Sequence, residues 1–131
     1  MDSIFTKIIN GQIPSYKVGE NQYAFAFLDI SPLAKGHTLI VPKIQVDNIF
    51  DLQDPWFSQL HLFSQQVAKA IQFSIPCLRV GSAVIGLEIP HAHIHLVPLQ
   101  SIHDLDFSKP KLKLTADEMT EIANRIASNL H

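Results

Sequence analysis

The sequence predicts a single α+β domain, residues 1–131, built on an antiparallel sheet. Strand-like segments run through the middle of the chain, amphipathic helices lie before, between and after them, and short turns join the first strands as in a meander. At 131 residues the chain can bury one proper core. Its hydrophobic fraction of 47% lies in the globular range and argues against a disordered chain.

The N-terminal half begins with a short helix and continues as a meander of strands. In SIFTKIIN the apolar residues recur at helical spacing, and Gly11 follows as a cap. Strands are expected at YKVGE, at YAFAFLDI (23–30) and at HTLIVP (37–42). A tight turn near Asn21 joins the first two, and SPLAKG is turn material between the second and third.

Two amphipathic helices are predicted farther along the chain. Asp54 is expected to be the N-cap of the first, with Pro55 at the first helical position. Its apolar stripe consists of Trp56, Leu60, Phe63, Val67, Ala70 and Ile71. The second helix starts at the capping-box pattern of Thr115 and Glu118, and its stripe consists of Met119, Ile122, Ala123, Ile126, Ala127 and Leu130. Between the helices, LRVGSAVIGL (78–87) is expected to form a strand interrupted by glycine.

The segment HAHIHLVPL (91–99) places a histidine at every second position. Side chains of a strand alternate between its faces, so His91, His93 and His95 would line one face. The aliphatic residues between them would line the other face and pack on a core. Prolines bracket the run too closely for a helix. Because same-face positions lie roughly 7 Å apart along a strand, three imidazoles can converge on one small ligand.

Three chemistries use histidines that converge in this way. Imidazole can bind a transition metal, act as a nucleophile or acid–base catalyst, or bind an anion through its N–H. A fourth interpretation puts all three on the solvent face of an edge strand. A chain of 131 residues is too short for the (β/α)₈ barrel that usually carries a metal-binding HxH pair. The first acids downstream, Asp104 and Asp106, lie in a loop-like segment that makes a weak metal site.

Charge and composition narrow the classes of partner. The formal net charge of -2 gives no general attraction to nucleic acid or to anionic membranes, so neither is an expected partner. KPKLK (109–113) is the only basic cluster and is expected to be a solvated loop. The sequence has no transmembrane run and no signal-peptide pattern, which favours a cytoplasmic protein. The single cysteine, Cys77, cannot form an internal disulfide.

HAHIHLVP resembles the H-φ-H-φ-H-φ-φ signature, with φ apolar, of the histidine triad (HIT) family. IFTKIINGQIPSYKV is similar to the N-terminal segment of that family, and AFAFLDISPLAKGHTLIVPK is similar to its central hairpin. The similar blocks span residues 3–98, which leaves 99–131 as an extension with a C-terminal helix. The resemblance implies a HIT-like fold whose five-stranded antiparallel sheet continues across a homodimer as ten strands.

The resemblance also implies a reaction. Members hydrolyse or transfer nucleoside monophosphate groups of nucleoside phosphoramidates, acyl-nucleotides or dinucleoside polyphosphates, without a metal or other cofactor. His93 matches the nucleophile, which forms a nucleotidyl-histidine and needs its other ring nitrogen hydrogen-bonded to a backbone carbonyl. His95 and His37 match residues that contact the phosphate, and His91 matches a supporting position.

The substrate-binding residues implied by the resemblance describe a purine nucleotide. Asp29 matches the acid that accepts hydrogen bonds from the ribose hydroxyls, although it is also placed to cap a turn. An apolar cleft around the base is implied for Ile4, Phe5, Ile8, Phe27 and Ile30, for which ordinary core packing is the alternative. Glu88 is expected to face the leaving group or to lie in a solvated turn.

Two segments depart from the family pattern. Structural zinc is bound at four positions in many members; here three of them hold Ser3, Thr6 and Gln45, which leaves His91 alone, so no metal is expected. The polar residues that usually precede the triad strand are replaced within LRVGSAVIGLE, where Arg79 either supplies a phosphate contact or points to solvent. This second departure keeps open a non-catalytic nucleotide-binding or adaptor protein on the same fold. A metal-binding protein that uses the three histidines is a third hypothesis.

Overall fold

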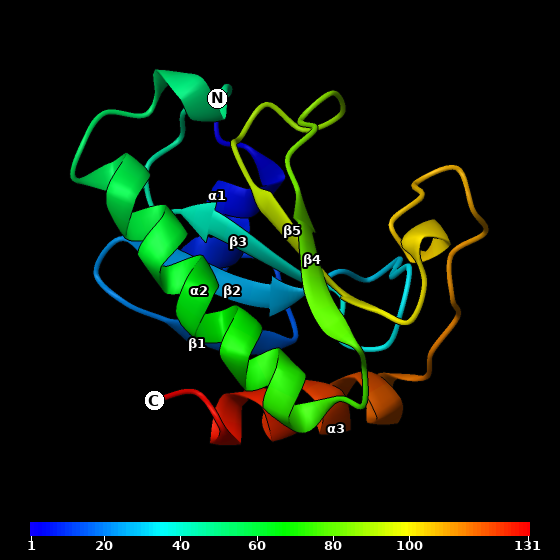
Figure 1. Cartoon of the computed structure of the whole chain (residues 1–131). Coiled ribbons are helices and arrows are strands. Elements are labelled where there is room, and N and C mark those ends of the chain that lie inside the picture. The colour runs from blue at the N-terminus through cyan, green and yellow to red at the C-terminus, as the bar shows by residue number, and fades with distance from the viewer.

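The computed structural model describes residues 1–131 as a five-stranded antiparallel sheet with helices on both faces (Figure 1). The strands are β1 (Lys17–Glu20), β2 (Ala24–Leu28), β3 (Thr38–Pro42), β4 (Arg79–Ala83) and β5 (Ile94–Leu99). Their order in the sheet is β1-β2-β3-β5-β4, so β1 and β4 form its edges. The predicted α+β architecture is confirmed.

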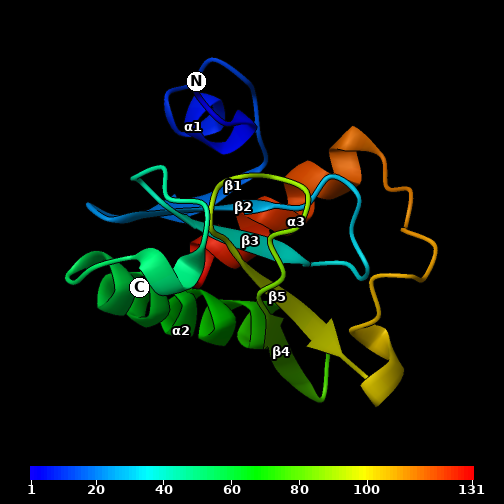
Figure 2. The ribbon, with the colours of Figure 1, turned by 90° about the horizontal axis from the view of Figure 1, so that it is seen from above.

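The helices are α1 (Ile4–Ile9), α2 (Trp56–Ser74) and α3 (Ala116–Ser128), together with two short 3₁₀ helices, η1 (Ile49–Asp51) and η2 (Ile102–Asp104). Figure 2 shows α1 on one side of the sheet and α2 on the other. α3 packs against both α2 and the edge strand β1. None of these helices combines the length and apolar composition needed to cross a bilayer.

The two faces of the sheet have separate cores. Alternate residues of the central strands, such as Ala26, Ile40 and Ile94, belong to the larger core that contains the apolar stripes of α2 and α3. The residues between them on β2 and β3 pack with Phe5 of α1 in a smaller core formed by Phe5, Phe25, Phe27, Leu39 and Val41. Every residue of β2 is therefore buried, since both faces of the strand are covered.

Both predicted helical stripes are confirmed except at their ends, because Trp56 and Ala127 are half-buried and Leu130 lies beyond the last residue of α3. Leu60, Phe63, Val67, Ala70 and Ile71 are buried on α2, and Met119, Ile122, Ala123 and Ile126 are buried on α3. Thr115 and Glu118 form the expected capping box. α2, however, begins at Trp56, so Pro55 and not Asp54 holds the cap position. Asp54 still caps the helix from one residue farther out, because its Oδ1 accepts hydrogen bonds from the backbone N–H and the hydroxyl of Ser58.

All the predicted strands are shorter in the structure, and the one expected over 23–30 spans only Ala24–Leu28. Two others illustrate why. The strand expected over 78–87 ends at Ala83, and Gly86 then adopts φ +71° in an irregular segment. The histidine strand begins only at Ile94, because the Ala92 N–H donates to the Val46 carbonyl in a loop and not to a neighbouring strand. The alternation of side chains nevertheless extends back to Ala92, which is buried in the larger core.

Candidate functional site

A cavity of about 460 Å³ opens between α1, the end of β2, the segment 85–89 and the histidine strand. It combines a large apolar wall with a few polar groups, as small-molecule sites do. The seven residues predicted to bind substrate all line it: Ile4, Phe5, Ile8, Phe27, Asp29, Ile30 and Glu88. His93 and His95 line it as well, whereas His37 and His91 lie outside its lining.

The sheet register brings the polar groups of the cavity together. Phe27 pairs with Leu39, and Leu39 pairs with His95, so these three side chains form a row across one face of the sheet. Asp29 follows β2 and continues that face beyond the end of the strand. The turn between β2 and β3 closes with a hydrogen bond of 3.0 Å from the Asp29 N–H to the His37 carbonyl, which returns His37 to the same edge.

His93 is held with one ring nitrogen available for reaction. Its Nδ1 lies 2.8 Å from the backbone carbonyl oxygen of His91. A carbonyl oxygen can only accept, so Nδ1 carries the proton and the Nε2 of the neutral ring keeps its lone pair. The Phe5 ring packs edge-on against the imidazole, with 5.0 Å between the ring centroids. The carbonyl hydrogen bond that the sequence predicted for a nucleophilic histidine is therefore present.

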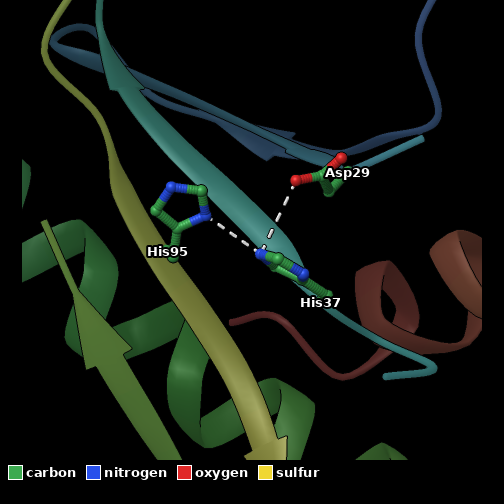
Figure 3. A group of neighbouring side chains, drawn as sticks. All are labelled: Asp29, His37 and His95. Atoms are coloured by element: carbon green, nitrogen blue, oxygen red, sulfur yellow. Dashed lines mark hydrogen bonds and ion pairs between the residues drawn. The ribbon is translucent and has the colours of Figure 1, made fainter. Parts of the chain in front are cut away.

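A chain of hydrogen bonds from the Leu33 N–H through His37 to His95, called the relay below, determines which nitrogen of each ring carries the proton (Figure 3). The Leu33 backbone N–H donates to His37 Nδ1 at 3.0 Å, so the neutral His37 ring carries its proton on Nε2. That nitrogen lies 3.0 Å from His95 Nδ1, which must accept. His95 consequently carries its own proton on Nε2. Through this relay the cavity gains a neutral N–H donor on His95 close to the lone pair of His93.

Burial keeps the relay uncharged. The pKa of His95 is lowered to about 3, mainly because burial disfavours the charged ring and also because His37 and His93 lie beside it. Burial also lowers the pKa of His37, against the opposing effect of the Asp29 carboxylate. Asp29 Oδ2 lies 3.7 Å from His37 Nε2. Both rings are therefore neutral at pH 7, which is the state that the relay requires.

His37 has a different position from the one implied by the resemblance. It was expected to contact a phosphate directly, but it is 1% exposed and lies behind His95. In this geometry His37 acts through the tautomer and orientation of His95. Asp29 lines the cavity, and its Oδ1 also accepts the Ser31 N–H at 2.8 Å as the expected turn cap.

His91 is the hub of a second hydrogen-bond network. Its Nε2–H donates to the Pro42 carbonyl at 2.9 Å, and its Nδ1 accepts from the Ser3 hydroxyl at 2.7 Å. The Ser3 N–H and the Thr6 hydroxyl each donate to Gln45 Oε1 at 2.7 Å. The four positions named for a structural metal thus meet in space, but they meet through hydrogen bonds.

The residues present do not fit a metal ion. Hydroxyl and amide oxygens are poor substitutes for the thiolate, imidazole and carboxylate ligands that zinc prefers. Asp29, His37 and His95 also bring potential ligand atoms within 4.8 Å of one another. A metal on His37 Nε2 would move the proton of that ring to Nδ1. The Nδ1–H would then face the Leu33 N–H, and two donors cannot form a hydrogen bond with each other.

The sequence model of the HIT domain matches residues 10–102. The chain belongs to the HIT family. A HIT-like protein of Borreliella burgdorferi is 31% identical over 137 residues, which cover 98% of this chain and 99% of that protein. The adenosine 5'-monophosphoramidase of Saccharomyces cerevisiae is 38% identical over 96 residues, which cover 72% of this chain but 61% of the yeast protein. A crystal structure of a HIT-like protein from Bartonella henselae matches with a TM-score of 0.85 at 26% identity, covering 98% of this chain and 97% of that one.

Two residues of this HIT domain's cavity lie in the C-terminal extension, and the sequence did not indicate them. Phe107 and Lys111 both line the cavity. Lys111 belongs to the KPKLK cluster, which was expected to be a solvated loop. Both residues lie in a segment without helix or strand, so no helical or strand periodicity in the sequence could indicate that they face the site. Arg79, the other candidate cation, lies exposed on β4 and does not line the cavity.

We predict that acid destabilises the fold of this HIT protein, because three of its histidines are buried. The pKa values of His37, His91 and His95 are all lowered, mainly by burial, from an ordinary value of 6.5. The unfolded chain then binds more protons below pH 6.5, so stability is full above that pH and falls as the pH drops toward 3. His95 alone should cost about 2 kcal/mol between pH 7 and pH 5. Urea unfolding at the two pH values measures the change, and equal free energies of unfolding would contradict the prediction.

Proposed function

We propose that the protein is a metal-independent nucleotidyl hydrolase or transferase that uses His93 as its nucleophile. Its substrates would be nucleoside phosphoramidates, acyl-nucleotides or dinucleoside polyphosphates, cleaved at the α-phosphorus. The observation that carries the proposal is the pair of opposite tautomers at the end of the cavity. His93 offers a lone pair on Nε2, and His95, whose ring centroid lies 5.0 Å from that of His93, offers an N–H.

The reaction would proceed in two displacements at phosphorus. In the first, His93 Nε2 forms a bond to the α-phosphorus while the bond from phosphorus to the leaving group breaks. In the second, water attacks the same phosphorus and the P–N bond breaks, which releases the nucleoside monophosphate and restores the neutral ring. The His95 N–H would donate to a non-bridging oxygen and stabilise the charge that develops there.

The cavity supports a nucleotide as the substrate. Phe5 and Phe27 meet edge to face, with 5.5 Å between their centroids, and provide an apolar wall on which a planar base can pack. Asp29 lines the same cavity, with its Oδ2 3.7 Å from His37 Nε2, and a carboxylate there can accept hydrogen bonds from ribose hydroxyls. Adenosine monophosphoramidase activity of the yeast relative supports an adenine nucleotide as the first substrate to test.

The direct test is to mix the protein with adenosine 5'-phosphoramidate and follow AMP. We expect steady release of AMP, and rapid quenching in the first turnover should trap a protein heavier by one adenylyl group. Fragmentation of the trapped protein should place that group on the peptide containing His93. If the protein binds AMP but gives neither product nor adduct, the hydrolase proposal is rejected and the hypothesis of a non-catalytic nucleotide-binding or adaptor protein is favoured.

A homodimer is part of the same proposal. The β4 edge of the sheet has no partner strand within the chain, and two large apolar side chains are exposed on the part of the chain that leads into β4, Phe73 at the end of α2 by 81% and Leu78 by 72%. An open edge next to exposed apolar residues is a typical site for pairing with a second copy. Light scattering of the purified protein tests this, and a monomer at micromolar concentration would overturn it.

A further inference from the structure

The cavity contains very little positive charge for a site that would bind a phosphate. His95 and His37 are neutral, and the carboxylates of Asp29 and Glu88 both line the cavity. The segment 85–89 adds the apolar side chains of Ile85, Leu87 and Ile89 to its wall, but no cation. Among all the lining residues Lys111 is the single lysine or arginine.

The C-terminal extension holds Lys111 at this place through contacts on both sides. The Leu112 N–H donates to the Pro32 carbonyl at 2.8 Å, which fastens the segment to the turn between β2 and β3. The Phe107 ring packs edge-on against His95, with 4.7 Å between centroids, and lies 6.2 Å from His37. The extension therefore packs against His37 and His95, and it contributes Lys111 to the cavity that His93 and His95 also line.

The ammonium group of Lys111 is held by two hydrogen bonds and keeps one N–H donor free. Its Nζ donates to the carbonyl of Phe107 at 2.6 Å and to the carbonyl of Lys109 at 3.1 Å. An ammonium has three N–H donors, so one remains for a ligand. No carboxylate forms an ion pair with Lys111, whereas Lys17, Lys35, Lys43 and Lys109 each have an acidic partner within 4.0 Å.

We propose that Lys111 is the residue that binds and neutralises the phosphate of the substrate, supplied to the active site by the C-terminal extension of the same chain. This inference rests on the proposed function for its ligand, a nucleoside monophosphate group. A charge-assisted hydrogen bond from Lys111 offsets the repulsion between the phosphate and the two carboxylates of the cavity. It also stabilises the charge that increases on phosphorus oxygens as His93 attacks.

The test separates phosphate recognition from nucleoside recognition. Calorimetry measures the affinity of the full chain for AMP and for adenosine, which differ by the phosphate alone. We expect Lys111→Met to weaken AMP binding by about tenfold and to change adenosine binding by less than about twofold. Lys111→Arg should retain most of the AMP affinity. Rising salt should weaken AMP binding more in the wild type than in Lys111→Met.

Two further variants exclude a merely structural role. Lys111→Gln keeps an N–H donor for the carbonyls of the turn but loses the charge, so it should behave like Lys111→Met. Lys109→Ala is the matched control, because Lys109 lies on the same segment, pairs with Asp104 at 4.0 Å and does not line the cavity. AMP binding should be unchanged in this control.

The outcomes distinguish this inference from the proposed function. Wild-type affinity for AMP in Lys111→Gln, or equal losses for AMP and adenosine in Lys111→Met, would overturn the phosphate role. The binding measurements do not depend on turnover. AMP binding that depends on the charge of residue 111, in a protein that releases no AMP from adenosine 5'-phosphoramidate, would uphold this inference and reject the hydrolase.

Discussion

His93→Ala is expected to abolish nucleotide turnover while the protein stays folded and still binds AMP. The substitution removes the nitrogen that would attack phosphorus, and no other lone pair in the cavity is held in the same way. His95 Nδ1 accepts from His37, and the Nδ1 of His91, which lies outside the cavity lining, accepts from Ser3. Loss of a nucleophile that acts as part of a unit typically costs several powers of ten, so we expect kcat to fall by at least about a thousandfold.

The measurement is AMP release from adenosine 5'-phosphoramidate, with the intact mass of the quenched protein beside it. His103→Ala is the matched control, because His103 is exposed and lies outside the cavity. That control should turn over like the wild type and show the same adduct. A His93→Ala protein that keeps more than about a tenth of the rate would mean that another group attacks phosphorus, contrary to the proposed mechanism.

His37→Leu is expected to lower kcat by about a hundredfold with little change in KM. Leucine cannot donate to His95 Nδ1, so the proton of His95 is free to move to that nitrogen and the N–H facing the cavity is lost. Substrate binding should persist, because His37 does not line the cavity. The leucine also leaves the Leu33 N–H without its acceptor, which should destabilise the fold by about 1–3 kcal/mol.

His37→Gln distinguishes the relay from a packing effect. The glutamine side chain ends in an amide N–H that can reach His95 Nδ1, so it should recover part of the lost kcat. Steady-state kinetics of the wild type and both variants, with urea unfolding of each, provide the comparison. If stability and kcat fall in parallel in both variants, and His37→Gln recovers none of the lost kcat, then the role of His37 is structural and the relay is not needed for catalysis.

Much of the fold could be predicted because its pattern is local. Alternation in AFAFL and HAHIHL and the 3.6-residue stripes of two helices depend on near neighbours in the sequence. Element ends were less accurate, since they depend on distant partners. The strand expected to start at His91 starts at Ile94 because Val46 and not a strand partner accepts the Ala92 N–H.

The candidate site divides in the same way. The motif indicated His93 and its carbonyl hydrogen bond, which joins residues two positions apart. The relay could not be derived from spacing, because His37 and His95 are 58 residues apart and meet only through the register of β3 and β5. Phe107 and Lys111 reach the cavity through an irregular segment whose path is set by tertiary contacts, and no sequence pattern encodes such a path.

The hydrogen bonds of His91 have a consequence for cooperativity. α1 has only six residues, too few for a helix that is stable alone, so it persists through docking. Ser3, its N-cap, is bonded to the His91 ring, while the His91 carbonyl holds the ring of His93. We therefore expect the wall that would receive the base and the atom that would attack phosphorus to open and close together, as one unit of local stability.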